Sequence, residues 1–154
     1  MRDNLKDEEP TVRQTAIRVL GAWPDASPLG DLLTVAREAE NVQIKILALR
    51  GFANLYRQAQ DLTEAELKSM ASEAMALADR RQERSLLLSA LAENPLAGNL
   101  DIPLSLLDDA DLKEEAAMAA LGILEALGDR WPDRAKSALA RIRAGASGSD
   151  VAAR

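Results

Sequence analysis

The feature that most constrains the fold is an apolar pattern that returns four times, each time after a basic residue. The basic residues are Arg13, Lys45, Arg84 and Lys113, which lie 32, 39 and 29 residues apart. The positions three, four and seven residues after each of them are apolar, and this spacing marks one face of an α-helix. An apolar helix face needs a neighbour to cover it. Its return at this interval therefore predicts similar helical units that stack on one another.

The helical signals divide the chain into eight helices that form successive pairs. Pro24 and Pro95 each end a run, Thr63 and Glu66 form a capping box, and Ser27 is expected to cap the helix that follows it. The expected helices cover residues 10–23, 26–40, 40–60, 62–80, 81–94, 100–109, 110–129 and 131–145. Sustained alternation of apolar and polar residues, the mark of a strand, is absent. The sequence thus predicts an all-α fold of about four helical hairpins.

The length of 154 residues suits one domain. We expect it to cover residues 1–144, with units at about 5–40, 41–80, 81–109 and 110–144, followed by a flexible tail at 145–154 that is rich in small residues. Gly21, Gly51 and Gly122 are interpreted as points of close helix packing. Met70, Met75 and Met118 are interpreted as core residues.

An acidic residue stands five positions before each of the four basic residues. We expect each acid to pair with the base that follows it, so that the pairs form a ladder that spaces the hairpins. An exposed pair of this kind contributes about 0–1 kcal/mol, so its main effect would be on register. The expected pairs are Glu8 with Arg13, Glu40 with Lys45, Asp79 with Arg84, and Asp108 with Lys113.

The order of acid, short gap, Val-Arg, alanine and Leu-Gly in DEEPTVRQTAIRVLG resembles a HEAT-type repeat, in the short form named after phycobilisome lyases. The segment DDADLKEEAAMAALG is similar, with lysine in place of arginine. The resemblance covers residues 5–144. It implies a right-handed α-α superhelix, with the first helix of each pair on the convex side and the second on the concave side. It also implies an interaction surface, and the repeat region of a larger bacterial protein.

The composition excludes several kinds of catalytic site. The chain has no cysteine and no histidine, so thiolate nucleophiles, Ser-His-Asp triads and zinc sites with Cys or His ligands cannot form. The tripeptide Trp-Pro-Asp occurs at residues 23–25 and 131–133, and we interpret it as a hairpin corner. The acidic runs are interpreted as residues at helix starts, where the helix dipole stabilises negative charge. We therefore predict no catalytic residue, no cofactor and no metal.

The predicted function is a protein-interaction or scaffolding module whose partner is another protein or a neighbouring domain. The expected surface is the solvent side of the second helices, formed by Asp31, Thr34, Arg37, Ser69, Glu73, Asp101, Ser105, Lys136 and Arg141. One alternative is binding of nucleic acid by the basic last hairpin, which the net charge of −6 disfavours. A second alternative is an enzyme or enzyme subunit of the bilin-lyase kind. No membrane insertion is expected, and a chain without cysteine suits the cytoplasm as well as the periplasm.

Overall fold

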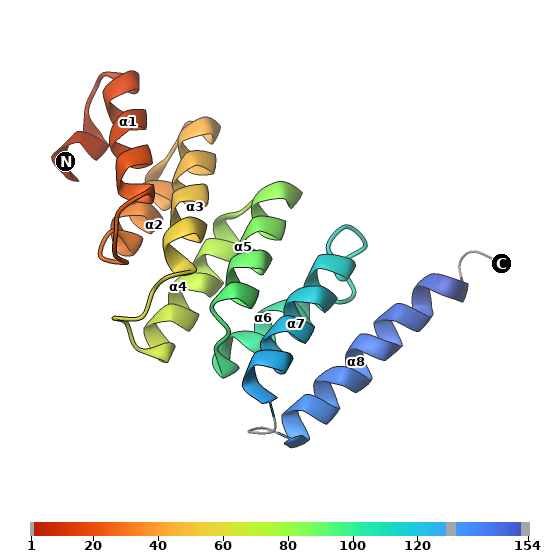
Figure 1. Cartoon of the computed structure of the whole chain (residues 1–154). Coiled ribbons are helices and arrows are strands. Elements are labelled where there is room, and N and C mark those ends of the chain that lie inside the picture. Colours follow the sequence, from red (N-terminus) through yellow and green to blue (C-terminus); the bar gives the residue numbers. More distant parts are fainter. Residues whose placement is uncertain (1, 129–131, 152–154) are drawn as a thin grey trace.

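The computed structural model describes residues 2–128 and 132–151, and within these residues it is built of helices alone. The all-α prediction is confirmed. A first layer holds α1 (Pro10–Gly21), α3 (Val42–Tyr56), α5 (Arg81–Glu93) and α7 (Lys113–Leu127). These four helices lie side by side in chain order (Figure 1), and each packs against the next.

The remaining helices form a second layer. This layer contains the 3-10 helix η1 (Arg2–Lys6), α2 (Leu29–Glu38), α4 (Glu64–Leu77), the 3-10 helix η2 (Ala97–Leu100), α6 (Asp101–Ser105) and α8 (Pro132–Val151). Of these, α2, α4 and α6 lie behind the first layer in Figure 1. The helix α2 packs much more extensively on α3 than on α1, although α1 precedes it in the chain. A second-layer helix therefore joins one hairpin to the next, which makes the core continuous.

The core follows the repeated apolar pattern of the sequence. Of its twelve positions, all but Ala117 are buried, and Ala117 is partly buried. Ile17, Phe52, Leu88 and Ile123 are each no more than 1% exposed at the centres of the first-layer helices. The four basic residues of the pattern stand in the first turns of these helices, as the spacing predicts.

Several predicted helix ends are confirmed by the local chemistry. Thr63 and Glu66 form the capping box, in which the Thr63 hydroxyl accepts from the Glu66 backbone N–H and the Glu66 carboxylate accepts from the Thr63 backbone N–H. Asn41 caps α3 by accepting from the backbone N–H of Gln43 and Ile44. The helix α5 ends at Glu93, two residues before Pro95, because a proline disfavours helical backbone in the residue before it.

The start of α2 differs from the prediction. Ser27 does not cap it, because the residue at the cap position is Pro28 and no side chain there accepts a hydrogen bond. The backbone N–H of Ser27 donates instead to Asp25 Oδ1 at 2.8 Å, which closes a turn after Trp23 and Pro24. The hydrogen bonds from Ser27 hold the pKa of Asp25 below its ordinary value. This agrees with the interpretation of the first Trp-Pro-Asp as a corner.

Two further predictions near the C-terminus are wrong. Met118 is not a core residue, because its side chain is 70% exposed on α7. The last helix does not end at Gly145 but continues to Val151, so residues 145–151 are helical, while residues 152–154 lie outside the described chain. Small residues such as those at 145–148 do not by themselves stop a helix.

The prediction that glycines mark points of close helix packing is confirmed at the contact between α1 and α3. A Cβ atom on Gly21 of α1 would lie 2.7 Å from Gly51 Cα of α3, and one on Gly51 would lie 3.1 Å from Gly21 Cα. No side chain fits between the two backbones there, so these glycines allow the closest approach of α1 and α3. Gly122 of α7 is less restricted, since its Cβ would lie 3.4 Å from Ala92 Cβ.

Candidate interaction surface

The predicted partner-binding residues lie on successive helices of the second layer. Asp31, Thr34 and Arg37 stand on α2, and Ser69 and Glu73 stand on α4. Asp101 and Ser105 belong to α6, and Lys136 and Arg141 to α8. All of them are exposed or partly exposed. We call these nine residues the second-layer surface.

Ion pairs join the second-layer helices through this surface. The guanidinium of Arg37 binds the carboxylate of Glu73, which connects α2 to α4. Lys68 Nζ lies 3.0 Å from Asp101 Oδ2 and connects α4 to α6. Arg2 Nε lies 2.7 Å from Asp31 Oδ2, so η1 is tied to α2 in the same manner. The structure thus places Asp31, Arg37, Glu73 and Asp101 in a row of three separate ion pairs, each of which joins two helices.

The other predicted surface residues do not join this row. The hydroxyls of Thr34 and Ser105 donate to carbonyls of their own helices, at Gly30 and Ile102. Arg141 Nη2 donates to the Leu104 carbonyl at 2.9 Å, which anchors α8 to α6. Ser69 and Lys136 are exposed. Of the basic last hairpin, Arg130 and Trp131 lie outside the described residues, so the second Trp-Pro-Asp cannot be compared with the first.

The predicted acid–base pairs of the ladder are not formed within the described residues, and this prediction is corrected. Arg13 Nε donates to the Asp7 backbone carbonyl at 3.0 Å, and Arg84 Nε donates to the Ala78 carbonyl at 2.7 Å. Arg13 Nη2 also reaches the Glu8 backbone carbonyl at 3.5 Å, but in neither case is the carboxylate five residues earlier the acceptor. A loop carbonyl is fixed beside the helix start, whereas an exposed carboxylate gains little from leaving water. The side chains of Glu8, Glu40, Asp108 and Lys113 form no ion pair with another described residue.

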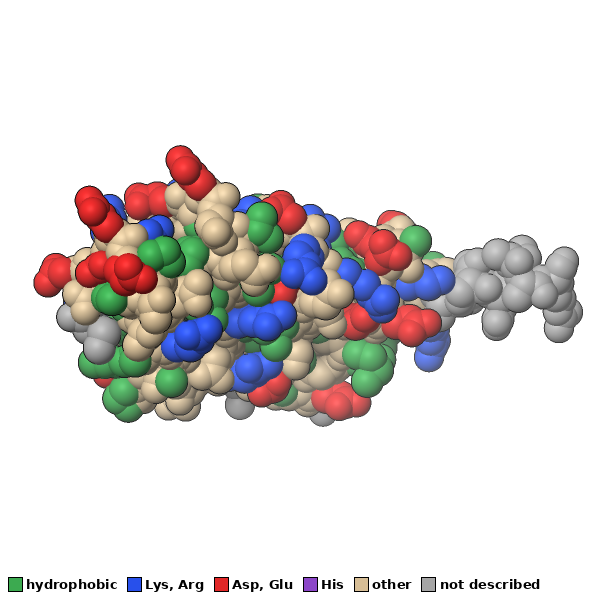
Figure 2. Space-filling model, turned by 90° about the horizontal axis from the view of Figure 1, so that it is seen from above, with side chains coloured by type: hydrophobic (Ala, Val, Ile, Leu, Met, Phe, Trp, Pro, Cys, Tyr) green, Lys and Arg blue, Asp and Glu red, His purple; other side chains and the backbone are tan. Residues whose placement is uncertain are grey.

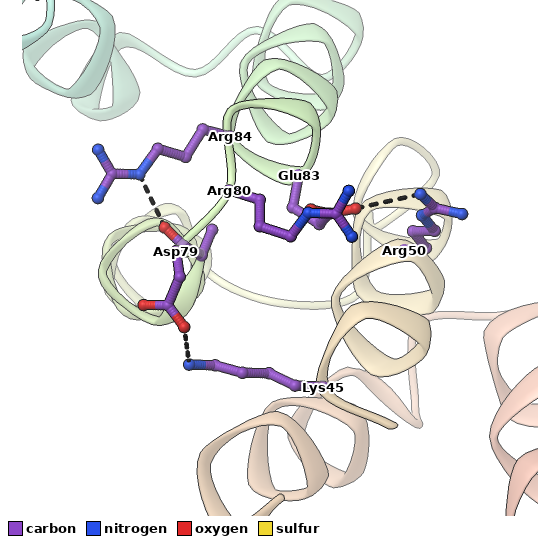
Figure 3. A network of polar contacts seen from close by, with 7 residues as sticks. Lys45, Arg50, Asp79, Arg80, Glu83 and Arg84 are labelled. Atoms are coloured by element: carbon purple, nitrogen blue, oxygen red, sulfur yellow. Dashed lines mark hydrogen bonds and ion pairs between the residues drawn. The ribbon is translucent and has the colours of Figure 1, made fainter. Parts of the chain in front are cut away.

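Lys45 pairs with the acid that precedes the next first-layer helix, α5. Its Nζ lies 2.6 Å from Asp79 Oδ2, in the loop before α5 (Figure 3), while the expected partner Glu40 lies in the preceding loop. A ladder therefore exists, but each of its steps runs from one first-layer helix to the next first-layer helix or to the loop before it. Asp79 and Lys45 belong to it as partners of each other. The spacing of five residues between each acid and the base after it does not predict this pairing.

A buried carboxylate stands at the centre of the ladder. Glu83 on α5 is 2% exposed, and its Oε1 accepts from Arg50 Nη2 of α3 at 3.1 Å. Arg80 Nε approaches the other oxygen at 3.6 Å, so that the carboxylate lies between two guanidinium groups (Figure 3). This arrangement compensates a charge that would otherwise be costly to bury. Sequence reasoning missed it, because Glu83 occupies a position that is apolar in the other three units.

Asparagine side chains make a second kind of link that the sequence did not reveal. Asn54 Nδ2 on α3 donates to the Gly21 carbonyl at 2.8 Å, at the end of α1. Asn94 Nδ2, at the end of α5, donates to the Tyr56 carbonyl at 2.8 Å, at the end of α3. Each amide satisfies a carbonyl that the preceding helix leaves without an intrahelical donor. The recurrence of an asparagine near the ends of α3 and α5 is the sequence feature from which these links could have been predicted.

Tyr56 and Asn99 form a buried polar contact between α3 and η2. Asn99 Nδ2 donates to the Tyr56 hydroxyl at 2.6 Å, and the two side chains are 1% and 0% exposed. Burial raises the pKa of Tyr56 to about 12, against the opposing effect of the hydrogen bond from Asn99. The contact fixes η2 against the first layer.

An open groove lies at the N-terminal end, between η1, α1 and α2. Its volume is about 670 Å³, and Leu5, Val35 and Ile44 contribute apolar side chains to its lining. Four of its charged residues pair with each other, because Lys6 Nζ lies 3.5 Å from Glu38 Oε2 in addition to the pair of Arg2 with Asp31. Across the described residues, three or more acids do not come close enough together to hold a metal ion.

Comparison of the chain with protein-family models, with curated proteins and with solved structures gave no match. The described helices include none with the length and apolar character needed to cross a bilayer. The resemblance to HEAT-type repeats therefore stays a prediction from the sequence.

Proposed function

We propose that this chain is a HEAT-like helical solenoid that acts as a non-catalytic protein-binding or scaffolding module, as the repeat region of a larger bacterial protein. The observation that carries the proposal is the row of separate ion pairs that join α2 to α4 and α4 to α6. The pairs of Arg37 with Glu73 and of Lys68 with Asp101 hold these side chains in a fixed pattern across three helices.

Such a row is suited to binding an extended protein segment or the flat face of a domain. Arg37 keeps 53% of its side chain exposed, so donors of its guanidinium group remain available to a partner. Because the side chains are already ordered, a partner loses less entropy in binding them. Stacked helical hairpins present extended surfaces of this kind, and the direction of the superhelix would place the second layer on the concave side.

The test uses the chain as bait in a crosslinking pull-down from its native source, with paired charge reversals. In the variant Arg37→Glu/Glu73→Arg the ion pair can re-form with reversed charges, so the fold is kept while the pattern on the surface changes. The matched control is Lys45→Glu/Asp79→Lys, which reverses an ion pair of the first layer. We expect a specific protein to be captured by the unchanged chain and by the control, and to be lost with the second-layer variant.

Two other outcomes would contradict the proposal. A protein captured equally by all three baits would place the binding surface elsewhere. Capture that disappears after nuclease treatment of the lysate would indicate that nucleic acid, and not protein, is the ligand. Far-ultraviolet circular dichroism and thermal unfolding of each bait confirm that the reversals leave the helices intact.

A further inference from the structure

A cavity with apolar and acidic walls opens between the loop that follows α1 and the loop that follows α3. Both loops lie at the lower ends of these helices in Figure 1. The volume of the cavity is about 510 Å³, and two of its eight lining residues are acidic while none is basic. The lining consists of Asp25, Ala26, Ser27, Leu29, Gly30, Asp61, Leu62 and Met70.

The cavity lies on the same helix faces as the ion pair between α2 and α4. Gly30 stands seven residues before Arg37 on α2, and Met70 stands three residues before Glu73 on α4. Residues at these spacings share one face of a helix. The guanidinium of Arg37 binds the carboxylate of Glu73, so these two faces are turned toward each other. A partner segment that contacts this ion pair therefore has the cavity within reach along the same two helices.

Hydrogen bonds hold the two loops that border the cavity. Gln58 Nε2 donates to the Trp23 carbonyl at 3.3 Å, which joins the loop after α3 to the loop after α1. The backbone N–H of Ser27 donates to Asp25 Oδ1 at 2.8 Å and closes the turn before α2. The cavity is thus formed by the chain itself, and a ligand does not have to order it.

The two acids of the cavity form no ion pair with another described residue. Asp61 is exposed, and Asp25 is bound to Ser27 alone. Arg2, whose charge also acts on Asp25, binds Asp31 and does not line the cavity. Figure 2 shows the side of the molecule at which the first-layer helices begin, where Lys and Arg side chains lie among the acidic ones. The cavity, in contrast, keeps a negative charge that favours a cationic ligand.

The following unit shows what a carboxylate at the start of a second-layer helix accepts. At the start of α4, Glu64 Oε1 accepts from the Gly98 backbone N–H of η2 at 2.6 Å. At the start of α2, no described residue of the following unit supplies such a donor to Asp25. A ligand with N–H donors would therefore complete at α2 a contact that the chain makes for itself at α4.

We propose that this cavity receives an arginine side chain of the partner protein, with the guanidinium at Asp25 and Asp61 and the aliphatic stem against Leu62 and Met70. A guanidinium group has five N–H donors in one plane, so it can bind two carboxylates at once. The stem of arginine covers apolar surface, and methionine adapts its shape to the group that packs on it. This inference rests on the proposed protein-binding function, and it names the chemistry by which the partner is recognised.

Methyl NMR of methionine tests the site, because Met70 lines the cavity and Met118 lies outside it on α7. The probe is N-acetyl-arginine amide, added to the full chain labelled with carbon-13 at the methionine methyl groups. We expect the Met70 signal to move and to saturate with a Kd on the order of 1 mM, as suits a ligand of this size. The signal of Met118, which is 70% exposed, should stay in place. The variant Met70→Leu assigns the signal.

Two controls separate the effect of charge from the effect of shape. N-acetyl-citrulline amide has nearly the same shape as the probe without its charge, and we expect it to bind at least about fivefold more weakly. Asp61→Asn should weaken binding of the arginine probe about threefold or more. Glu40→Gln removes the charge of another exposed acid, in the loop before α3, and should leave binding unchanged.

Three results would overturn the proposal. The first is a Met70 signal that does not move with up to about 10 mM of the arginine probe. The second is an equal response to the citrulline probe, or an equal loss of binding in Asp61→Asn and Glu40→Gln. The third is an equal response to N-acetyl-glutamate amide, which would indicate that the backbone N–H groups at the start of α2 bind an anion.

The titration contains no partner protein, so its result is independent of the charge-reversal pull-down. A negative titration, together with capture that is lost in Arg37→Glu/Glu73→Arg, refutes the arginine site and keeps the protein-binding function. A positive titration without a captured protein refutes the function and keeps the site.

Discussion

The helices α3 and α8 show how position in the stack decides what a helix can bury. Eight of the fifteen residues of α3 are buried, and they pack against helices on both sides and in both layers. In α8, which is longer, Ala138 is the one buried residue among the side chains that the structure describes. Both helices carry apolar residues at helical spacing. The central helix α3 has neighbours on both sides of its own layer and in the second layer, whereas a terminal helix has a neighbour on one side of its layer.

The comparison implies that stability is concentrated in the middle of the molecule. The rings of Phe52 and Tyr56 lie 5.7 Å apart between their centroids, both on α3. The helix α8 is held by Ala138, the partly buried Ile142 and the hydrogen bond from Arg141 to Leu104. We expect α8 to open independently of the other helices, since local stability follows the density of buried contacts.

The largest expected difference is between truncating a side chain of the central helix α3 and truncating one of the terminal helix α8. Phe52→Ala should lower the free energy of unfolding by about 3–5 kcal/mol, because it removes a fully buried ring and leaves a cavity. Leu139→Ala should lower it by less than about 1 kcal/mol, because the side chain is already 38% exposed. Urea unfolding followed by circular dichroism measures both values. Equal losses would contradict the contrast between α3 and α8.

The next effect is the alkaline titration of Tyr56. Its pKa is raised from 10.0 to about 12 in the folded chain, so the folded state keeps its proton while the unfolded state loses it. The contribution to stability is complete below pH 10 and is lost as the pH rises towards 12. At about 1.4 kcal/mol per unit of pKa, the loss approaches roughly 3 kcal/mol.

Tyr56 is the one tyrosine of the chain, so tyrosinate absorbance follows its titration directly. Urea unfolding between pH 9 and pH 12 follows the stability. The control Tyr56→Phe should remove this pH dependence, although it costs about 1–3 kcal/mol at neutral pH by leaving Asn99 Nδ2 without its acceptor. If the midpoint of the Tyr56 titration lies near the ordinary pKa of tyrosine, the Tyr56 hydroxyl is accessible to water. The core around α3 is then less tightly packed than the burial of its side chains indicates.

The smallest effect compares two glycine-to-alanine changes. Gly21→Ala should destabilise the chain by about 1–3 kcal/mol, because the new Cβ would lie 2.7 Å from Gly51 Cα and would force α1 away from α3. Gly30→Ala on α2 meets nothing within 4 Å and should stabilise it by about 0.4–1 kcal/mol through the unfolded state. Differential scanning calorimetry resolves the opposite signs, and a shift of the same sign for both would show that helix propensity, and not close packing, governs these sites.

Much of the local structure could be predicted from the sequence, because its signals act over a few residues. Proline positions, the capping box at Thr63 and the apolar spacing of α1, α3, α5 and α7 depend only on backbone geometry and on the need to cover one face. The start of α2 was predicted wrongly because Asp25 accepts a hydrogen bond from the Ser27 backbone N–H. This bond holds Ser27 in a turn before the helix, and Pro28 takes the cap position. The helical continuation of α8 past Gly145 was missed because small residues permit a helix without requiring one.

The sequence by itself therefore determined that the chain is helical, where most helices lie to within a few residues, and which faces of the first-layer helices are apolar. The tertiary structure decided which charges meet. Lys45 binds Asp79 and not Glu40, and Arg84 binds a backbone carbonyl and not Asp79. Such partners lie more than thirty residues apart or compete with fixed carbonyl groups. Their choice depends on how the hairpins stack, and residue spacing within one unit carries no information about that stacking.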